Sequence, residues 1–118
     1  MVPIDRNVTS LDEAGLSVAL DADGYLANAD DWTPAIAVRL ARNDGLELSE
    51  RHWAVINQLR VFWYNELVSP PLRILVRVAG QVPGGEHGTA RALHGLFPGE
   101  PAKKACRYAG LPRPEGCL

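Results

Sequence analysis

Cysteine is scarce in this sequence, which contains only Cys106 and Cys117, both close to the C-terminus. Three histidines (His52, His87 and His94) are also present, but no pair of these residues has the spacing of a zinc site. We therefore expect neither a bound metal nor another cofactor. The sequence also lacks a G-x-S-x-G motif, which argues against a serine hydrolase.

Long hydrophobic runs are absent as well. No stretch reaches the ~20 apolar residues of a membrane span, because Arg60, Arg73 and Arg77 interrupt the most apolar segments. The N-terminus has no cationic region followed by an apolar one, so no secretory signal is visible. We expect a cytoplasmic protein that does not insert into membranes, in which the thiols are more naturally reduced than locked in a structural disulfide.

Acidic and basic residues are unevenly distributed along the chain. Residues 1–50 contain ten acidic and three basic residues, whereas residues 51–118 contain four acidic and nine basic ones. Two interpretations stay open at this point. The charges are either dispersed in solvent, or they set up a positive field around the cysteines that favours thiolates and an acidic partner.

The hydrophobic pattern predicts one mainly α-helical domain over residues 1–118, a small orthogonal helical bundle with a helix–turn–helix-like arrangement. An N-terminal β-hairpin is expected over residues 16–28, around a turn at Asp21–Gly24, after a mobile extension at residues 1–14. Cap and stop signals predict five helices. The first starts at Pro34 and stops at 43–45, and the others span residues 49–68, 70–82, 90–96 and 101–109.

Spacings of three and four residues mark the apolar faces of the two central helices. For residues 49–68 the predicted face is Trp53, Ile56, Leu59, Trp63 and Leu67, and for residues 70–82 it is Leu72, Leu75, Val76, Ala79 and Val82. The aromatic residues are expected in the core, including Trp32, Phe62 and Tyr64. These two helices could also form a helix–turn–helix module whose arginines contact phosphates, but the net charge of −2 makes nucleic-acid binding the less favoured hypothesis.

The C-terminal segment changes character after the last predicted helix. Gly110 is a candidate αL residue that ends this helix, and the two prolines that follow exclude further helix. We expect residues 111–118 to form a flexible arm with Cys117 near its tip. In polyproline geometry, the seven residues from Gly110 to Cys117 reach roughly 22 Å.

The two thiols allow two interpretations. A structural disulfide would close a twelve-residue loop and stabilise the fold by roughly 2.8 kcal/mol, but it would fasten only the chain end. Alternatively, the thiols are reactive, and nearby cations favour thiolates by lowering the thiol pKa. Those cations, which we also regard as candidate partner-binding residues, are Lys103, Lys104, Arg107 and Arg113.

The C-terminal sequence PAKKACRYAGLPRPEGCL resembles that of the DsrC/TusE family of sulfur carriers, which includes the gamma subunit of dissimilatory sulfite reductase. The likeness continues through DADGYLANADDWTPAIAVRLARNDGLELSERHW, LVSPPLRILV and GLFP. The resemblance implies a small helical domain with an N-terminal hairpin and a mobile arm. It also implies that Cys117 carries sulfur as a persulfide, and that Cys106 is a resolving thiol that joins it in a disulfide or trisulfide.

The resemblance further implies how such a protein acts. It is a sulfur-carrying substrate protein rather than a catalyst with its own turnover, although sulfurtransferase activity is an alternative. Its implied partners are sulfite reductase and a membrane-bound reductase complex, both reached through the arm. The TusE branch instead relays sulfur to 2-thiouridine in tRNA and typically lacks the upstream cysteine, so the presence of Cys106 favours the DsrC-like branch.

Overall fold

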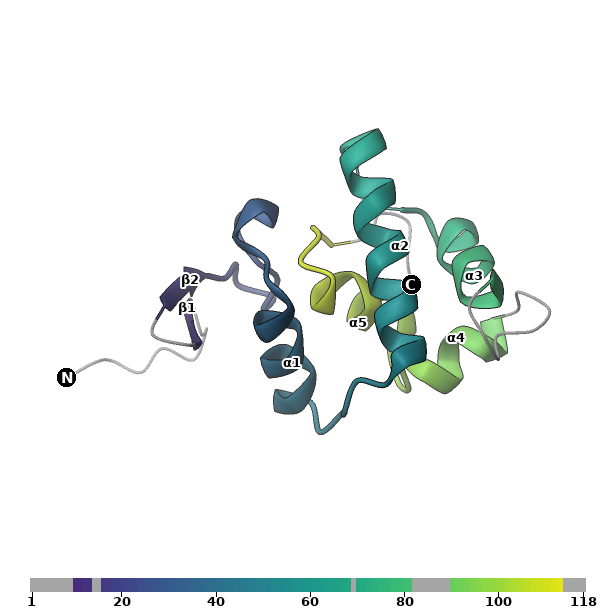
Figure 1. Ribbon diagram of the computed structural model, residues 1–118, viewed down its shortest axis with the longest axis horizontal. Helices are drawn as coiled ribbons and strands as arrows, with labels where there is room; N and C mark the ends of the chain where they lie inside the picture. Colours follow the sequence, from purple (N-terminus) through teal and green to yellow (C-terminus); the bar gives the residue numbers. More distant parts are fainter. Residues whose placement is uncertain (1–9, 14–15, 69, 82–89, 114–118) are drawn as a thin grey trace.

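The computed structural model describes residues 10–13, 16–68, 70–81 and 90–113. Within this part the chain forms a two-stranded hairpin and five α-helices, as the apolar spacing and the cap signals predict, together with one 3-10 helix that was not predicted. The elements are β1 (Ser10–Glu13), β2 (Leu16–Ala19), η1 (Ala29–Asp31), α1 (Pro34–Asn43), α2 (Glu50–Glu66), α3 (Leu72–Gln81), α4 (Ala90–Leu96) and α5 (Pro101–Tyr108) (Figure 1).

The N-terminal hairpin exists, but its first strand lies earlier than predicted. β1 pairs antiparallel with β2, with Ser10 opposite Ala19 and Glu13 opposite Leu16. The expectation that residues 10–13 belong to a mobile extension is therefore wrong. Ser-Leu-Asp-Glu is too short and polar to show a strand pattern, so its pairing depends on the neighbouring strand rather than on its own sequence.

The predicted turn at residues 21–24 is confirmed, although it does not join two long strands. Asp21 N donates to Tyr25 O at 2.7 Å, and Gly24, at a φ of +88°, donates from its N to Asp21 O at 3.0 Å. An isolated antiparallel bridge between Leu20 and Leu26 closes the turn. The segment after β2 therefore folds back as a tight loop, not as a second strand.

Helix boundaries follow the caps that the sequence predicts. The Thr33 hydroxyl accepts from Ile36 N at 3.3 Å and Pro34 is the first residue of α1. At the start of α2, Ser49 and His52 form a capping box in which each side chain accepts from the other's backbone N–H. These local signals are strong because they satisfy N–H groups that the helix itself leaves unbonded.

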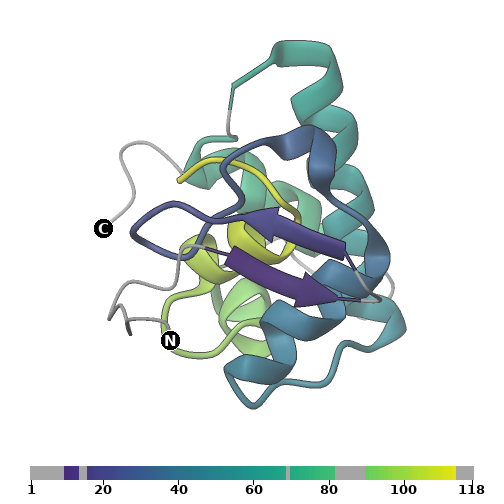
Figure 2. The same cartoon turned by 90° about the vertical axis from the view of Figure 1, so that its left-hand side faces the viewer.

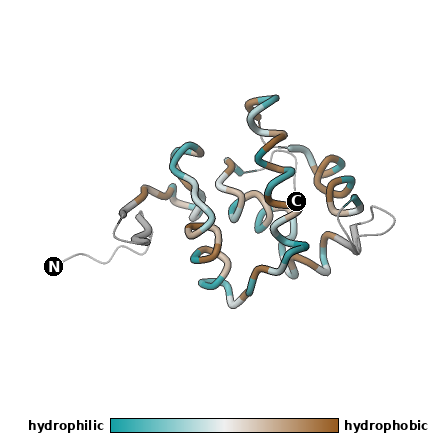
Figure 3. The backbone as a smooth tube through the Cα atoms, viewed as in Figure 1, coloured by the Kyte–Doolittle hydropathy of each residue, from teal (hydrophilic) through white to brown (hydrophobic). Residues whose placement is uncertain are grey.

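Helix α5 lies in the middle of the bundle, where it packs against α1, α2 and α4 (Figure 1). Helix α3 packs against α2 and α4, and the hairpin lies at one end of the molecule beside α1 (Figures 1 and 2). Hydrophobic residues recur along each long helix and meet in one core (Figure 3). No helix in the described part of the chain is long and apolar enough to cross a membrane.

The predicted apolar faces are partly wrong at the α2–α3 corner. Leu67 is 69% exposed and Leu72 is 44% exposed. The buried residues of α2 are His52, Val55, Ile56, Leu59 and Arg60, whereas the predicted Trp53 and Trp63 are only partly buried against the core. The last turns of α2 project beyond the other helices (Figure 1), and Val61, Tyr64 and Leu67 are exposed there.

Candidate functional site

Cys106 lies near the end of α5, on the face that packs into the core. Its exposed fraction is 0%, and its neighbours on that face are the small residues Ala102, Ala105 and Ala109. Because these side chains are small, α5 can approach the surrounding helices closely, and cysteine fits there as a small hydrophobic residue. Cys117 lies outside the described residues.

The C-terminus of α5 is closed by a Schellman motif. Gly110 adopts a φ of +76°, as the sequence predicts, and its N–H donates to Arg107 O at 3.1 Å. Leu111 N donates to Cys106 O at 3.0 Å. The backbone of the residue that carries the thiol is thus bonded to the first residue of the predicted arm.

Two side chains from distant segments bond the remaining carbonyl groups at this helix end. Trp32 Nε1 donates to Tyr108 O at 2.8 Å, and Arg60 Nη1 donates to Ala109 O at 2.7 Å. The Arg60 guanidinium also lies 4.4 Å from the centroid of the Trp32 ring, in a cation–π contact. The start of the arm is therefore fixed by η1 and α2 as well as by its own helix.

Arg60 is the residue that the sequence analysis missed, since it was interpreted only as an interruption of an apolar segment. A signal was available, because Arg60 directly follows Leu59 and lies four residues after Ile56 on the buried face. A buried arginine requires partners for its charge. Tyr64, expected in the core, is instead exposed, and its hydroxyl accepts from Arg60 Nη2 at 2.9 Å.

The arm does not begin at residue 111, because Leu111 is fully buried. Pro112 and Arg113 are exposed, and Arg113 Nη2 forms an ion pair with Asp23 Oδ2 at 3.1 Å. This pair joins the arm to the 21–24 turn. Cys117 is the fourth residue after Arg113 in the sequence, which corresponds to a reach of about 12 Å in polyproline geometry.

Each of the four cations predicted to act on the thiols has a partner within the described residues. Arg107 pairs with Asp44, Arg113 with Asp23 at 3.1 Å, Lys103 with Glu100 at 3.8 Å, and Lys104 Nζ donates to Pro98 O at 2.7 Å. Two of these acids belong to the acidic first half of the chain. The uneven charge distribution is thus matched by ion pairs between the halves, and lowering of the thiol pKa stays a prediction.

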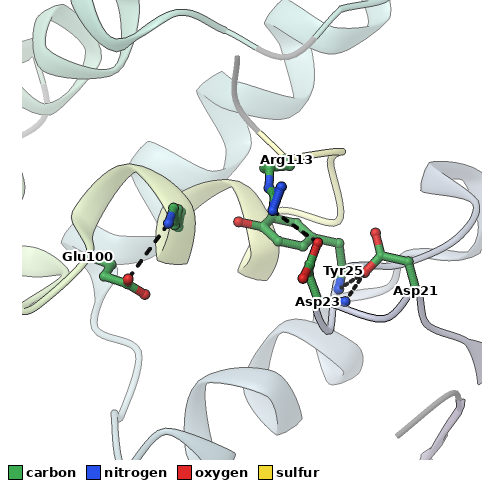
Figure 4. Close-up of polar contacts among 6 residues, drawn as sticks. Asp21, Asp23, Tyr25, Glu100 and Arg113 are labelled. Carbon is green, nitrogen blue, oxygen red and sulfur yellow. Dashed lines mark hydrogen bonds and ion pairs between the residues drawn. The ribbon is translucent and has the colours of Figure 1, made fainter. Parts of the chain in front are cut away.

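A pocket of about 160 Å³, here named the α5 pocket, brings three of the four cations together. Lys104 lies outside it. Figure 4 shows the Asp23–Arg113 pair beside the ring of Tyr25, whose hydroxyl points towards α5. The lining residues are Asp23, Tyr25, Glu100, Lys103, Arg107 and Arg113.

Asp44, at the C-terminal end of α1, contacts Arg107, which is one of the residues that line the pocket. Asp44 Oδ2 accepts from the Tyr108 hydroxyl at 2.6 Å and also pairs with Arg107. Burial, reinforced by the Asp44 carboxylate, raises the pKa of Tyr108 above its ordinary value. Tyr108 therefore stays protonated and keeps donating to Asp44 at neutral pH. Among the described residues no group of His, Cys, Asp and Glu could hold a metal ion.

Residues 13–118 match the family model described as DsrC like protein. The chain belongs to the DsrC family. It is 45% identical to the sulfurtransferase TusE of Sodalis glossinidius over 104 residues, which cover 88% of this chain and 96% of that protein. It is 43% identical to TusE of Yersinia pestis, covering 92% and 99% of the two chains.

Solved structures show the same fold. The NMR structure of DsrC from Allochromatium vinosum has a TM-score of 0.81 at 43% identity, covering 92% of this chain and 97% of that one. The crystal structure of the oxidized gamma subunit of dissimilatory sulfite reductase from Archaeoglobus fulgidus has a TM-score of 0.79 at 35% identity, covering 92% and 99%. The resemblance inferred from the sequence is thereby confirmed for the family and for the fold.

Proposed function

We propose that this protein is a DsrC-like sulfur carrier. Cys117 carries sulfane sulfur as a persulfide, and Cys106 resolves it to a disulfide or trisulfide. The protein is a substrate of its partner enzymes, not a catalyst with its own turnover. Its cycle takes place in the cytoplasm and needs no cofactor.

The observation that best supports this proposal is the closure at the end of α5. Trp32, Arg60 and the Schellman motif fix the chain at Gly110, immediately after the helix that contains Cys106. The arm that carries Cys117 therefore starts from a fixed point at the end of α5, and it is short. Such an arrangement allows one cysteine to visit an external donor and to return to the other.

The partners proposed for the arm follow from the relatives. The Archaeoglobus fulgidus structure is named as a subunit of dissimilatory sulfite reductase. We therefore propose that a sulfite-reductase-like enzyme exchanges sulfur with Cys117, and that a membrane-bound reductase complex regenerates the thiols. The cationic side chains near the arm, Lys103, Lys104, Arg107 and Arg113, are proposed to contact these partners and to favour the thiolates.

A second candidate function is a TusE-type sulfur relay to tRNA, favoured by the 45% identity to a TusE protein. The requirement for Cys106 distinguishes the TusE-type relay from the DsrC-like cycle. A relay requires only Cys117, so Cys106→Ser would pass sulfur to an acceptor protein at an unchanged rate. A DsrC-like cycle requires both thiols, so the same variant would stop at the persulfide.

The proposal is tested by intact mass after incubation with a small sulfane-sulfur donor. The native protein and Cys106→Ser should each gain one sulfur atom that a reductant removes, whereas Cys117→Ser should gain none. The native protein alone should go on to the internal disulfide with release of hydrosulfide, and it should reach the trisulfide only when a two-electron oxidant is added. Normal loading of Cys117→Ser through Cys106 would contradict the role proposed for Cys117.

A further inference from the structure

The large hydrophobic residues that are exposed in the described part of the chain all belong to residues 61–72. They are Val61, Tyr64, Leu67, Val68 and Leu72, with exposed fractions from 44% to 69%. Single exposed apolar residues are normal on a protein surface, whereas a group of them at one place indicates a contact surface. This group lies at the corner between α2 and α3, at the opposite end of the molecule from the N-terminal hairpin (Figure 1).

A groove of about 290 Å³ between α2 and α3, here named the α2–α3 groove, shares Val61 with this surface. Its lining residues are Gln58, Val61, Phe62 and Asn65 of α2, and Ile74, Arg77, Val78 and Gln81 of α3. On both helices these positions follow the spacing i, i+3, i+4 and i+7, so each wall is one helix face about two turns long. A third helix packs into such a groove through the same spacing, whereas an extended segment, with its period of two, does not match it.

Two arginines of α3 beside this groove have no counter-charge. Arg77 lines the groove and Arg73 lies one turn before it, and both are exposed. Neither side chain forms a hydrogen bond or an ion pair with another described residue. No carboxylate lines the groove, α3 contains none, and those of α2, Glu50 and Glu66, lie at its two ends. The groove therefore combines apolar walls with two uncompensated positive charges, which favour an occupant that brings carboxylates.

A second copy of this chain does not offer such an occupant within its described helices. Helices α1, α3, α4 and α5 contain no acidic residue. Helix α2 contains only Glu50 and Glu66, at opposite ends. No described helix therefore presents two carboxylates one turn apart, and the charges of the groove favour a different protein as its partner.

Nucleic acid matches the surface less well than a protein helix does. Phosphates would neutralise Arg73 and Arg77, but a phosphate backbone gains nothing from the exposed apolar residues between α2 and α3. An amphipathic helix satisfies both features at once, because it buries apolar side chains and carries charges along their edge.

We propose that the α2–α3 groove is a docking site for an amphipathic, acidic α-helix of a partner protein. The apolar face of that helix packs against the lining residues Val61, Phe62 and Ile74. Two carboxylates, one turn apart on the same helix, form ion pairs with Arg73 and Arg77.

Docking at this groove leaves the arm free, since none of its lining residues lines the α5 pocket. A partner bound at the groove would raise the effective concentration of its own reacting group around the arm. That this partner takes part in sulfur transfer rests on the proposed function of Cys117, whereas the docking itself does not.

The groove is tested by fluorescence anisotropy with a labelled, stapled helical peptide of about 15 residues. The peptide carries leucines at i, i+3, i+4 and i+7 and two glutamates one turn apart at the edge of this face. It should bind the native chain with a Kd below about 1 mM, and a peptide with lysines in place of the glutamates should bind at least ~5-fold more weakly. Val61→Asp should weaken binding of the glutamate peptide at least ~10-fold, because it places a carboxylate in the apolar contact.

The double variant Arg73→Gln/Arg77→Gln should weaken binding of the glutamate peptide by about 3- to 10-fold. Both side chains are exposed and without partners among the described residues, so the variant should fold like the native chain. The matched control is Arg42→Gln, which removes an exposed arginine from α1 and should leave the affinity unchanged.

The proposal would be overturned by no binding of the glutamate peptide up to about 1 mM, or by equal affinities in the native chain and the double variant. Sedimentation of the native chain as a dimer that Val61→Asp dissociates would assign the groove to a second copy and overturn the proposal. Displacement of the peptide by a short DNA duplex would do the same in favour of nucleic acid. Sulfur loading of native Cys117 is measured separately by mass, and its failure would contradict the proposed function while peptide binding still decides the groove.

Discussion

Glycine is required at position 110 for two separable reasons. Its φ of +76° lies in the left-handed region, and a Cβ built there would lie 2.5 Å from Trp32 Cδ1. Trp32 cannot shift easily, because its Nε1 is bonded to Tyr108 O. We expect Gly110→Ala to lower the free energy of unfolding by about 2–5 kcal/mol, as measured by urea denaturation.

Gly45→Ala is the matched control for this substitution. Gly45 has a φ of +81°, but a Cβ there would meet nothing within 4 Å. Gly45→Ala should therefore lower the free energy of unfolding only by the cost of the left-handed backbone conformation, about 1–2 kcal/mol. Equal losses in the two variants would mean that Trp32 moves aside and does not fix the start of the arm.

His52 belongs to the capping box of α2, and its protonation state makes the stability of the protein depend on pH. Its Nδ1 lies 3.0 Å from the Ser49 backbone nitrogen, from which it accepts, and its Nε2 lies 2.6 Å from Leu96 O, to which it donates. Burial lowers the pKa of His52 from its ordinary 6.5, and Arg51 adds to this effect. The folded protein therefore holds the neutral imidazole, whereas the unfolded chain binds a proton below about pH 6.5.

Stability should consequently fall as the pH falls below about 6.5, with a slope of at most ~1.4 kcal/mol per pH unit from this group. The pH dependence of the urea midpoint between pH 5 and 7.5 measures it. His52→Gln should flatten the curve in this window. His94→Gln, at an exposed position, should leave the curve unchanged, and an unchanged slope in His52→Gln would assign the effect to other groups.

At the scale of elements, Arg60 joins α2 to the end of α5. Its guanidinium donates to Ala109 O and, at 3.2 Å, to Ala29 O, so Arg60→Met leaves two carbonyl groups without this donor. We expect a loss of about 2–4 kcal/mol in the free energy of unfolding. Arg73→Met, at an exposed position on α3, should lose under ~0.5 kcal/mol. A similar small loss for Arg60→Met would contradict its role at the arm.

The boundary between α5 and the arm can be located by truncation. A chain that ends at Arg113 keeps the buried Leu111 and the ion pair to Asp23, so its melting temperature should change by no more than about 2 °C. A chain that ends at Gly110 loses a fully buried leucine, which is worth about 2–5 kcal/mol, and should melt at least ~10 °C lower. Equal melting temperatures would place the boundary at Gly110, as the sequence predicts.

At the scale of the whole molecule, the order of helices was predictable because caps, prolines and apolar spacing are local signals. Helices α1, α4 and α5 start at the predicted residues 34, 90 and 101. What could not be predicted depends on contacts between distant segments. The packing of the Arg60 guanidinium against Trp32, and the hydrogen bonds that both side chains donate to the end of α5, have no counterpart in the spacing of residues along the chain.

The candidate site, like the fold, could be predicted from the sequence only in part. The roles of Gly110 and of the cations were suggested by residue type and position alone. Their partners were not, because Asp23 and Asp44 lie 90 and 63 residues before Arg113 and Arg107. The charge imbalance between the halves was visible in the sequence, but only the fold shows that it is used to join the first half to α5 and to the arm.

The Asp23–Arg113 pair should therefore influence whether the arm reaches out to an external sulfur donor or folds back to Cys106. With the pair formed, the arm is anchored at Arg113 beside the pocket, and the four residues to Cys117 span about 12 Å in polyproline geometry; without the pair, the last anchored residue is the buried Leu111 and the span is roughly 19 Å. Arg113→Gln should slow formation of the internal disulfide after sulfur loading while leaving loading from a small donor unchanged. Because an exposed ion pair contributes at most about 1 kcal/mol, the slowing should be no more than ~5-fold.

Mass spectrometry over time measures loading and internal disulfide formation separately in one sample. The matched control is Arg42→Gln, which removes another exposed ion pair, to Glu47 at 3.8 Å, away from the arm. Arg42→Gln should change neither rate. An unchanged rate of disulfide formation in Arg113→Gln would show that the prolines and the Schellman motif direct the arm without help from the turn, since the covalent path from Gly110 to Cys117 is the same in both proteins.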